Sequence, residues 1–359
     1  MTYILPHIRE MKPYEAGIQP SEKRKMIKLN LNENPFPPSQ NVLRVLHTIQ
    51  EDTLRLYPDQ HCDELREALA KEYRVTKEQT FCGNGSSEII SLIFKLFIGP
   101  HRSIAIPDPT FSLYYSVASI YQVECMKIPT RDDFSVDIDL LLESKANAII
   151  LVNPNAPTGR LLDIAEVERL VSKFSGLVIV DEAYIDFANP SSSAIPLLKK
   201  YNNLIVIRTF SKVYSLCGIR VGYCFSNKEF ITALETGRNL FNVNVISQKL
   251  ALAALMDQEH LVRTTTAVKH IREAFSNNLR KLGFAVIPSK TNFILCSPPS
   301  KLGRNGAKEL YNKLLERNIY VRYFETPRLL DKLRISIGTK EEMATLYNQL
   351  HQILQSETF

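Results

Sequence analysis

Short apolar runs alternate with helical patterns between about residues 41 and 255, and this alternation limits the possible folds more than any other feature of the chain. The segments between most of the runs are long enough to hold crossover helices, so consecutive strands can lie parallel in one sheet. Runs with few polar residues are typical of strands that are covered on both faces. We therefore predict an α/β fold with a mostly parallel central sheet, built from residues 103–106, 123–128, 148–152, 177–180 and 204–207.

One further strand is expected to run in the opposite direction. Residues 220–225 form an apolar run that follows residues 204–207 after only about a dozen residues, which show little helical pattern. A parallel return needs a longer and usually helical connection, whereas an antiparallel return does not. We expect residues 220–225 to be antiparallel to their neighbours in the sheet.

The 359 residues exceed what one compact core supports, which predicts two domains. Residues 260–282 form a long amphipathic stretch that leads into further strand and helix patterns, typical of a smaller α+β domain. The first 40 residues are rich in proline and asparagine and predict an extended arm that belongs to this small domain. The expected division is an arm at 1–40, a large α/β domain at 41–255 and a small domain at 256–359.

Composition and charge argue against several classes of protein. The net charge is +6, but lysine and arginine are interleaved with acidic residues, so we expect no nucleic-acid partner. The six cysteines form no Cys-x-x-Cys pair, and we expect no metal site. No apolar run approaches the ~20 residues that cross a bilayer, and Pro6, His7 and Arg9 interrupt any secretory signal. We therefore expect a cytoplasmic protein with free thiols and no membrane partner.

Polar residues directly follow three of the predicted strands. They occupy residues 153–159, 181–184 and 208–212, just beyond the carboxyl ends of the strands, where open α/β sheets bind ligands. Each set alone is ordinary turn composition. Together they offer an amide, a carboxylate and a lysine at one edge of the sheet, and this combination fits a single kind of chemistry.

The lysine, Lys212, can form a Schiff base with an aldehyde, and pyridoxal 5'-phosphate is the cofactor that uses such a bond as an electron sink. The cofactor's ring nitrogen must be protonated for this purpose, and Asp181 is placed to be its anionic partner. Asn155 and Tyr184 are candidates to donate hydrogen bonds to the phenolate oxygen of the ring. The predicted catalytic residues are therefore Lys212, Asp181 and Tyr184.

Two segments are expected to bind the cofactor phosphate. Ser211 and Arg220 lie on either side of the lysine, and an arginine can bind phosphate through two parallel hydrogen bonds. Gly85 and Ser86 lie in a glycine turn that opens a predicted helix, where free backbone N–H groups attract anions. This turn is not the dinucleotide-binding fingerprint, because Glu88 occupies the position of its third glycine, so a dehydrogenase is not favoured.

These residues belong to a long series of motifs that resembles the fold-type I pyridoxal-phosphate-dependent aminotransferases. Within that superfamily the series most resembles the histidinol-phosphate aminotransferase family, and the likeness extends over nearly the whole chain. Two positions depart from the family pattern: Ser87 stands where aspartate is frequent, and Ala156 stands where a second asparagine is frequent. The matching motifs are residues 12–14, 31–35, 55–59, 83–86, 109–111, 153–159, 181–184, 209–212, 218–222 and 333–338.

The resemblance implies further contacts with the cofactor, a partner subunit and the substrate. Phe111 is expected to stack on the cofactor ring, where the family more often has tyrosine. Tyr57 is expected to reach the cofactor phosphate of a partner subunit, which makes the active unit a homodimer. Arg334 resembles the residue that binds the anionic end of the substrate, and the other implied substrate contacts are Arg322, Tyr14 and Asn34.

The reaction that the resemblance implies is a ping-pong transfer of an amino group between histidinol phosphate and 2-oxoglutarate, a step of histidine biosynthesis. The donor amine displaces Lys212, and the freed lysine then moves a proton as general base and acid. An aromatic amino-acid aminotransferase and a threonine-phosphate decarboxylase use the same kind of cofactor site and stay open as alternatives. A cofactor-binding regulatory module is a non-enzymatic alternative, although no helix-turn-helix extension precedes residue 30.

Overall fold

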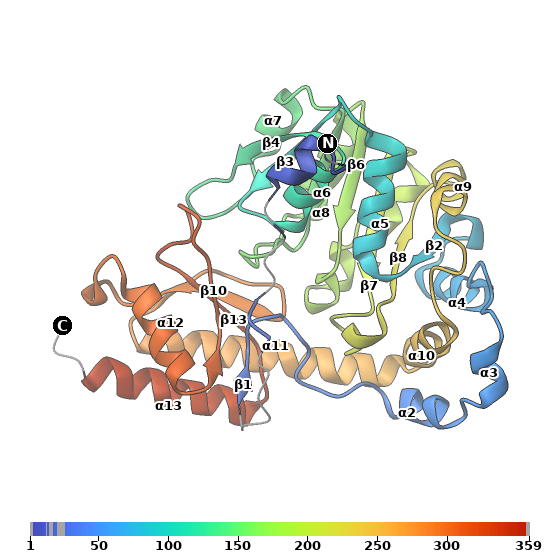
Figure 1. Ribbon diagram of the computed structural model, residues 1–359. Helices are drawn as coiled ribbons and strands as arrows, with labels where there is room; N and C mark the ends of the chain where they lie inside the picture. The colour runs from blue at the N-terminus through green and yellow to red at the C-terminus, as the bar shows by residue number, and fades with distance from the viewer. Residues whose placement is uncertain (1–2, 12, 14–16, 20–25, 357–359) are drawn as a thin grey trace.

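The computed structural model describes residues 3–11, 13, 17–19 and 26–356. Its largest feature within these residues is a seven-stranded sheet with the order β2-β8-β7-β6-β5-β3-β4 and helices on both faces (Figure 1). β8 runs antiparallel to β2 and β7, and the other neighbours pair in parallel. This confirms the six predicted strands and the reversed direction of β8, whereas β2 was not predicted. The strands are β2 (Thr80–Gly83), β3 (Ser103–Asp108), β4 (Glu124–Pro129), β5 (Ala148–Val152), β6 (Leu177–Asp181), β7 (Leu204–Thr209) and β8 (Gly222–Phe225).

Helices pack on both faces of this sheet. Because successive side chains of a strand point to opposite sides, each strand contributes to two hydrophobic clusters. In β5, Ile149 and Leu151 belong to one hydrophobic cluster, whereas Ala148, Ile150 and Val152 belong to another. The first cluster includes residues of α4 (Asp63–Tyr73), α7 (Ile138–Glu143), α8 (Ile164–Lys173) and α10 (Val245–Leu255). The second includes residues of α5 (Gly85–Ile93), α6 (Leu113–Ile120) and α9 (Lys228–Gly237).

A smaller antiparallel sheet follows in the last third of the chain, with the order β12-β13-β10-β9. Three helices accompany it: α11 (Gln258–Lys281), α12 (Gly306–Glu316) and α13 (Lys340–Ser356), and Figure 1 shows α11 passing along the base of the molecule toward the large sheet. The strands are β9 (Ala285–Val286), β10 (Phe293–Ser297), β12 (Arg322–Tyr323) and β13 (Leu333–Ser336).

The N-terminal segment contacts both parts of the molecule. In α1 (Pro6–Glu10), the Nε2 atom of His7 lies 3.2 Å from the carbonyl oxygen of Ile120. Further along, β1 (Ile27–Lys28) pairs in parallel with β11 (Ile319–Tyr320), and the Leu29 carbonyl accepts a hydrogen bond from the Ser336 amide. The chain then continues through α2 (Gln40–His47), which packs on α10, and α3 (Glu51–Arg55). The segment therefore contacts the smaller sheet through Leu29 and Ser336, and the division into an arm, a large domain and a small domain stays a prediction.

Two findings concern other kinds of site. In the part of the chain that the structure describes, no helix is both long enough and apolar enough to cross a membrane. The described residues also contain no group of three or more histidine, cysteine or acidic side chains that is arranged to hold a metal ion.

Candidate active site

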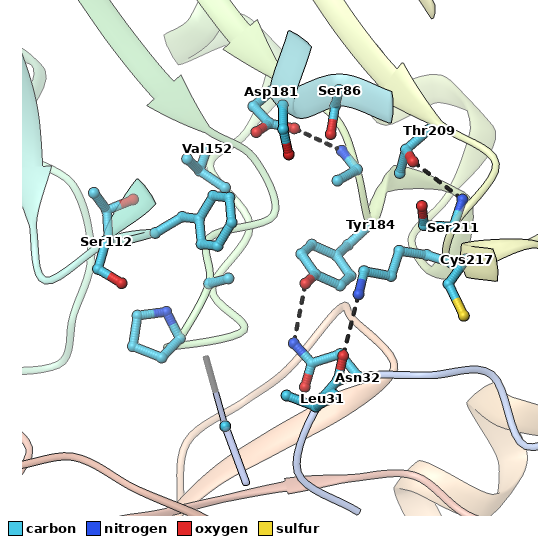
Figure 2. Close-up of a pocket in the computed structure, with 18 of the residues that line it drawn as sticks. Leu31, Asn32, Ser86, Ser112, Val152, Asp181, Tyr184, Thr209, Ser211 and Cys217 are labelled. Atoms are coloured by element: carbon cyan, nitrogen blue, oxygen red, sulfur yellow. Dashed lines mark hydrogen bonds between the residues drawn. The ribbon is translucent and has the colours of Figure 1, made fainter. Parts of the chain in front are cut away.

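A pocket lies between the large sheet, the N-terminal segment and the strands β12 and β13 of the small sheet (Figure 2). Asp181 ends β6 and Lys212 follows β7, so the pocket lies at the carboxyl ends of parallel strands, as the sequence predicts. The predicted site residues that line it are Ser86, Phe111, Asp181, Tyr184, Ser211, Lys212, Arg220, Arg322 and Arg334.

Five predicted site residues are not among those that line the pocket. Tyr14 lies outside the described residues. The others are Tyr57, Gly85, Asn34 and Asn155, and each has other contacts in the structure.

The Lys212 amine is held inside the pocket without a carboxylate. Its Nζ atom donates a hydrogen bond to the carbonyl oxygen of Leu31 at 3.2 Å and lies 5.7 Å from the centre of the Tyr184 ring. No carboxylate among the described residues lies within ion-pair distance of this amine. An amine with only a carbonyl partner can leave that partner and condense with an aldehyde.

Asp181 is a buried carboxylate with two fixed hydrogen bonds. Its Oδ2 atom accepts from the hydroxyl of Tyr114 at 2.8 Å, and its Oδ1 atom accepts from the amide of Ala183 at 3.1 Å. Burial raises the pKa of Asp181 to about 6, and the two hydrogen bonds oppose that rise. This carboxylate is a suitable partner for a cation in the pocket, because the cation would offset the free-energy cost of keeping a buried carboxylate ionised.

Tyr184 is oriented by Asn32, a residue that the sequence reasoning did not select. The Asn32 Nδ2 atom donates to the Tyr184 hydroxyl at 3.0 Å (Figure 2). The Asn32 Oδ1 atom accepts from the Ser336 hydroxyl at 3.2 Å. Since the Tyr184 oxygen already accepts a hydrogen bond, its own hydrogen is available to a group in the pocket. Asn32 lies in one of the motifs that the sequence shows, but its contact with Ser336 depends on the tertiary structure.

Asn34, in the same motif, faces a different partner. Its Nδ2 atom donates to the carbonyl oxygens of Lys212 and Val213 at 3.2 and 3.1 Å. The expected contact with substrate is therefore wrong in this structure, because both amide hydrogens are used to hold the backbone of the lysine loop.

Asn155 does not face the pocket either, and its neighbour Ala156 does. The Asn155 Nδ2 atom donates to the Pro109 carbonyl and to the Thr158 hydroxyl at 3.0 and 2.9 Å. Its Oδ1 atom accepts from the Thr110 hydroxyl at 2.7 Å. The expected hydrogen bond from Asn155 to the cofactor ring is therefore wrong in this structure, because the amide has no hydrogen left to donate and Ala156 has none to offer.

Arg220 lies in space that Gly85 leaves open. Arg220 donates from Nη1 to the Ser211 hydroxyl at 3.3 Å and to the Cys217 carbonyl at 3.1 Å. A Cβ atom at Gly85, which has a φ of +75°, would lie 2.6 Å from the Arg220 Nη2 atom. Gly85 thus shapes the site by having no side chain, and Ser86 at the start of α5 lines the wall next to it.

Two arginines supply positive charge on the side of the small sheet. Arg322 and Arg334 are directly opposite each other in the antiparallel pair of β12 and β13. Both guanidinium groups lie 5.4 Å from the centre of the Phe324 ring, and Arg334 also donates to the Asn30 carbonyl at 3.0 Å. Two like charges at opposed positions of a strand pair favour the arrival of an anion between them.

Tyr57 lies outside the pocket. Its ring stacks on Phe241 with a centroid distance of 4.4 Å, and its exposed fraction is 82%. Among the described residues the Tyr57 hydroxyl makes no hydrogen bond, so this exposed side chain can contact another molecule.

The comparison with protein families agrees with this arrangement. Residues 24–350 match the family model described as aminotransferase class I and II, and the chain belongs to that family. It is therefore a pyridoxal-phosphate-dependent aminotransferase. The site fits the cofactor, because one pocket holds a lysine amine, a buried carboxylate, an aromatic face and an arginine beside a helix start.

Within this family the chain belongs with the histidinol-phosphate aminotransferases. It is 41% identical over 350 residues to the enzyme of that name from Clostridium botulinum strain Hall, with 96% of this chain and 97% of the relative covered. It is 39% identical over 355 residues to the one from Lactococcus lactis subsp. cremoris strain SK11, with 98% of each covered. A solved structure of histidinol-phosphate aminotransferase from Sinorhizobium meliloti in complex with pyridoxal-5'-phosphate is similar, with a TM-score of 0.90 and 25% identity. The match covers 99% of this chain and 98% of the chain in that structure.

Proposed function

We propose that this chain transfers the amino group of histidinol phosphate to 2-oxoglutarate in histidine biosynthesis, in the cytoplasm. The observation that carries the proposal is a pocket with a lysine amine at one side and two opposed arginines at the other. Both proposed amine-side substrates, histidinol phosphate and glutamate, carry an amino group and a remote anion. The relatives that share about 40% of the sequence bear the name of this activity.

The cofactor supplies an electron sink for the bond that breaks at the substrate carbon. The Lys212 amine would hold the cofactor, and a substrate amine would take its place there. The Nζ atom of Lys212 would then be free to move the proton at the substrate carbon as general base and acid. The Leu31 carbonyl, which accepts from Nζ at 3.2 Å, is a resting partner for the amine.

Asp181 and Tyr184 are proposed to set the charge of the cofactor ring. Asp181 would pair with the protonated ring nitrogen, and the Tyr184 hydroxyl would donate to the phenolate oxygen. Asn32 fixes the direction of that hydroxyl by donating to its oxygen at 3.0 Å. Phe111 lines the pocket and is proposed to stack on the ring.

The remaining cofactor contacts are proposed at the phosphate. Ser86, Ser211 and Arg220 line the same part of the pocket, and Arg220 already donates to the Ser211 hydroxyl. A guanidinium group and the N–H groups at the start of α5 together suit a dianion. Gly85 contributes the room that this arginine needs.

Arg322 and Arg334 are proposed to bind the anionic end of each substrate in turn. A guanidinium group binds carboxylate and phosphate through similar pairs of hydrogen bonds, so one site serves the distal carboxylate of glutamate and the phosphate of histidinol phosphate. The aromatic ring of Phe324, which contacts both guanidinium groups, limits where they can move.

A homodimer is proposed as the active unit, with Tyr57 of one subunit reaching the cofactor phosphate of the other. The support is an exposed apolar surface around Tyr57, which stacks on Phe241. Leu54, Leu56 and Leu240 next to them are 61%, 57% and 73% exposed. Exposed apolar side chains near one another suit a contact with another protein, and a second copy of the chain is the proposed partner.

Steady-state kinetics test the proposed substrate. We expect kcat/KM for histidinol phosphate with 2-oxoglutarate to exceed that for phenylalanine by at least ~100-fold, because a site built to bind a substrate's remote anion strongly disfavours a substrate that lacks it. Release of carbon dioxide from threonine phosphate without a 2-oxo acid would instead assign the decarboxylase reaction. Equal rates with phenylalanine and histidinol phosphate would assign a broad aromatic aminotransferase.

A further inference from the structure

We propose that Tyr114 is a positioning residue for the cofactor, which acts by holding the carboxylate of Asp181 in place and in its anionic form. The inference rests on the proposed role of Asp181 as the partner of the ring nitrogen. Sequence reasoning did not select Tyr114, because it lies in a largely apolar helical segment, where an aromatic residue is expected to belong to the core.

The geometry gives Tyr114 one polar partner and a fixed position. Its side chain is 1% exposed, on the face of α6 that packs against the large sheet, and its hydroxyl donates to Asp181 Oδ2 at 2.8 Å. The other carboxylate oxygen accepts from the Ala183 amide. The two hydrogen bonds together fix the plane of the carboxylate at the pocket wall.

The charge of Asp181 depends on the same hydrogen bond. Burial raises the pKa of Asp181 to about 6, and the hydrogen bond from Tyr114 is the largest influence that lowers it. Burial and the neighbouring Asp181 carboxylate raise the pKa of Tyr114 well above its usual value, so the tyrosine stays protonated and remains the donor. Without this donor, the carboxylate would take up a proton nearer to neutral pH and lose the charge that pairs with the ring nitrogen.

The ring of Tyr114 has a separate contact that a substitution can preserve. It meets the ring of Phe111 edge to face, with a centroid distance of 6.1 Å and an angle of 88°. Phenylalanine at position 114 keeps this contact and the packing of the ring, and removes only the hydroxyl. The Tyr114→Phe variant therefore isolates the hydrogen bond to Asp181.

The next residue in the helix is a matched control. The Tyr115 hydroxyl donates to Asp108 Oδ1 at 2.7 Å, and Tyr115 is not among the residues that line the pocket. Tyr115→Phe makes the same chemical change one position away, on a tyrosine that also loses one carboxylate partner. A general effect of removing a hydroxyl from α6 would appear in both variants.

The experiment is a titration of the full-length, cofactor-free protein with pyridoxal 5'-phosphate between pH 5 and 9, followed by absorbance, in the absence of substrate. In the wild-type protein, cofactor affinity should fall as the pH drops through about 6, because Asp181 becomes protonated. In Tyr114→Phe this fall should begin about one pH unit higher, which is the size expected for one hydrogen bond to a charged group. Tyr115→Phe should follow the wild-type profile.

A second pair of variants separates this role from a merely structural one. Asp181→Asn has no charge to support, so adding Tyr114→Phe to it should not shift the pH profile further. The inference is overturned if Tyr114→Phe leaves the profile where it is in the wild type, or if it shifts the profile equally in the Asp181→Asn background. Because no substrate is present, either result leaves the assignment of histidinol phosphate untouched.

Discussion

The substitution Arg208→Met tests how the strand ends that carry the site are held together. Arg208 in β7 donates from Nε and Nη2 to the Glu182 Oε2 atom at 3.0 and 2.8 Å, and Glu182 directly follows Asp181 of β6. It also donates to the Ser193 hydroxyl at 3.0 Å and to Asp186 Oδ1 at 3.1 Å. The Arg208 and Glu182 side chains are only 5% and 1% exposed.

Methionine is apolar and of similar length, so Arg208→Met leaves most of the packing and removes the charge. Glu182 then remains buried without its cation, and breaking a buried pair in this way costs ~3–5 kcal/mol of the free energy of unfolding. Burial already raises the pKa of Glu182, and the charge of Arg208 opposes that rise. In the variant the folded-state pKa of Glu182 is raised further above its unfolded value, so folding favours the protonated form and the deficit should shrink as the pH falls.

Urea unfolding followed by circular dichroism measures this change, and Arg169→Met is a matched control. Arg169 pairs with Asp139 at 2.6 Å, but the two side chains are 30% and 65% exposed. The control should lose less than ~1 kcal/mol, because water screens and replaces a surface pair. If Arg208→Met is no less stable than the control, the buried pair does not hold the strand ends and this reasoning is refuted.

Three further predictions concern the pocket itself. Lys212→Ala should fold and bind the cofactor without the absorbance band of the lysine-bound form, and turnover should be lost; retained turnover would contradict the role of the amine. Ala156→Asn should place a second hydrogen-bond donor beside Tyr184 at the cofactor ring. It should lower the spectrophotometric pKa of the lysine-bound cofactor by ~1 unit, which is the size expected for one hydrogen bond to a charged group. An unchanged pKa would show that position 156 does not face the phenolate oxygen. Arg334→Met should raise KM for both histidinol phosphate and glutamate by at least ~10-fold, since a charge-assisted hydrogen bond contributes about 1.5 kcal/mol or more. A higher KM for only one of the two substrates would argue against a shared anion site.

The sheet was predictable because its signals are local. The buried parallel strands are apolar along most of their length, and the short link from β7 to β8 leaves no room for a crossover helix. The placement of Asp181 and Lys212 at strand ends follows from the same pattern. Each of these inferences needs only the order of residues along the chain.

The contacts that sequence missed depend on how separate segments meet. Asn32 and Asn34 are two residues apart in one motif, yet one contacts Tyr184 and the other holds the Lys212 backbone. Asn155 is likewise one residue away from the position that faces the pocket. A shift of one or two residues in an irregular segment changes which side chain faces the site, and the sequence contains no periodic signal that fixes it.

The most direct test of the account is the absorbance spectrum of the cofactor-loaded protein before and after addition of histidinol phosphate, without any 2-oxo acid. We predict that the band of the lysine-bound cofactor disappears and the band of pyridoxamine phosphate replaces it. Only an amine that displaces Lys212 and gives up its amino group produces this change. A band that histidinol phosphate leaves unmoved, and that phenylalanine or threonine phosphate converts, would contradict the proposed substrate, and the absence of any such band in the loaded protein would contradict the role of Lys212.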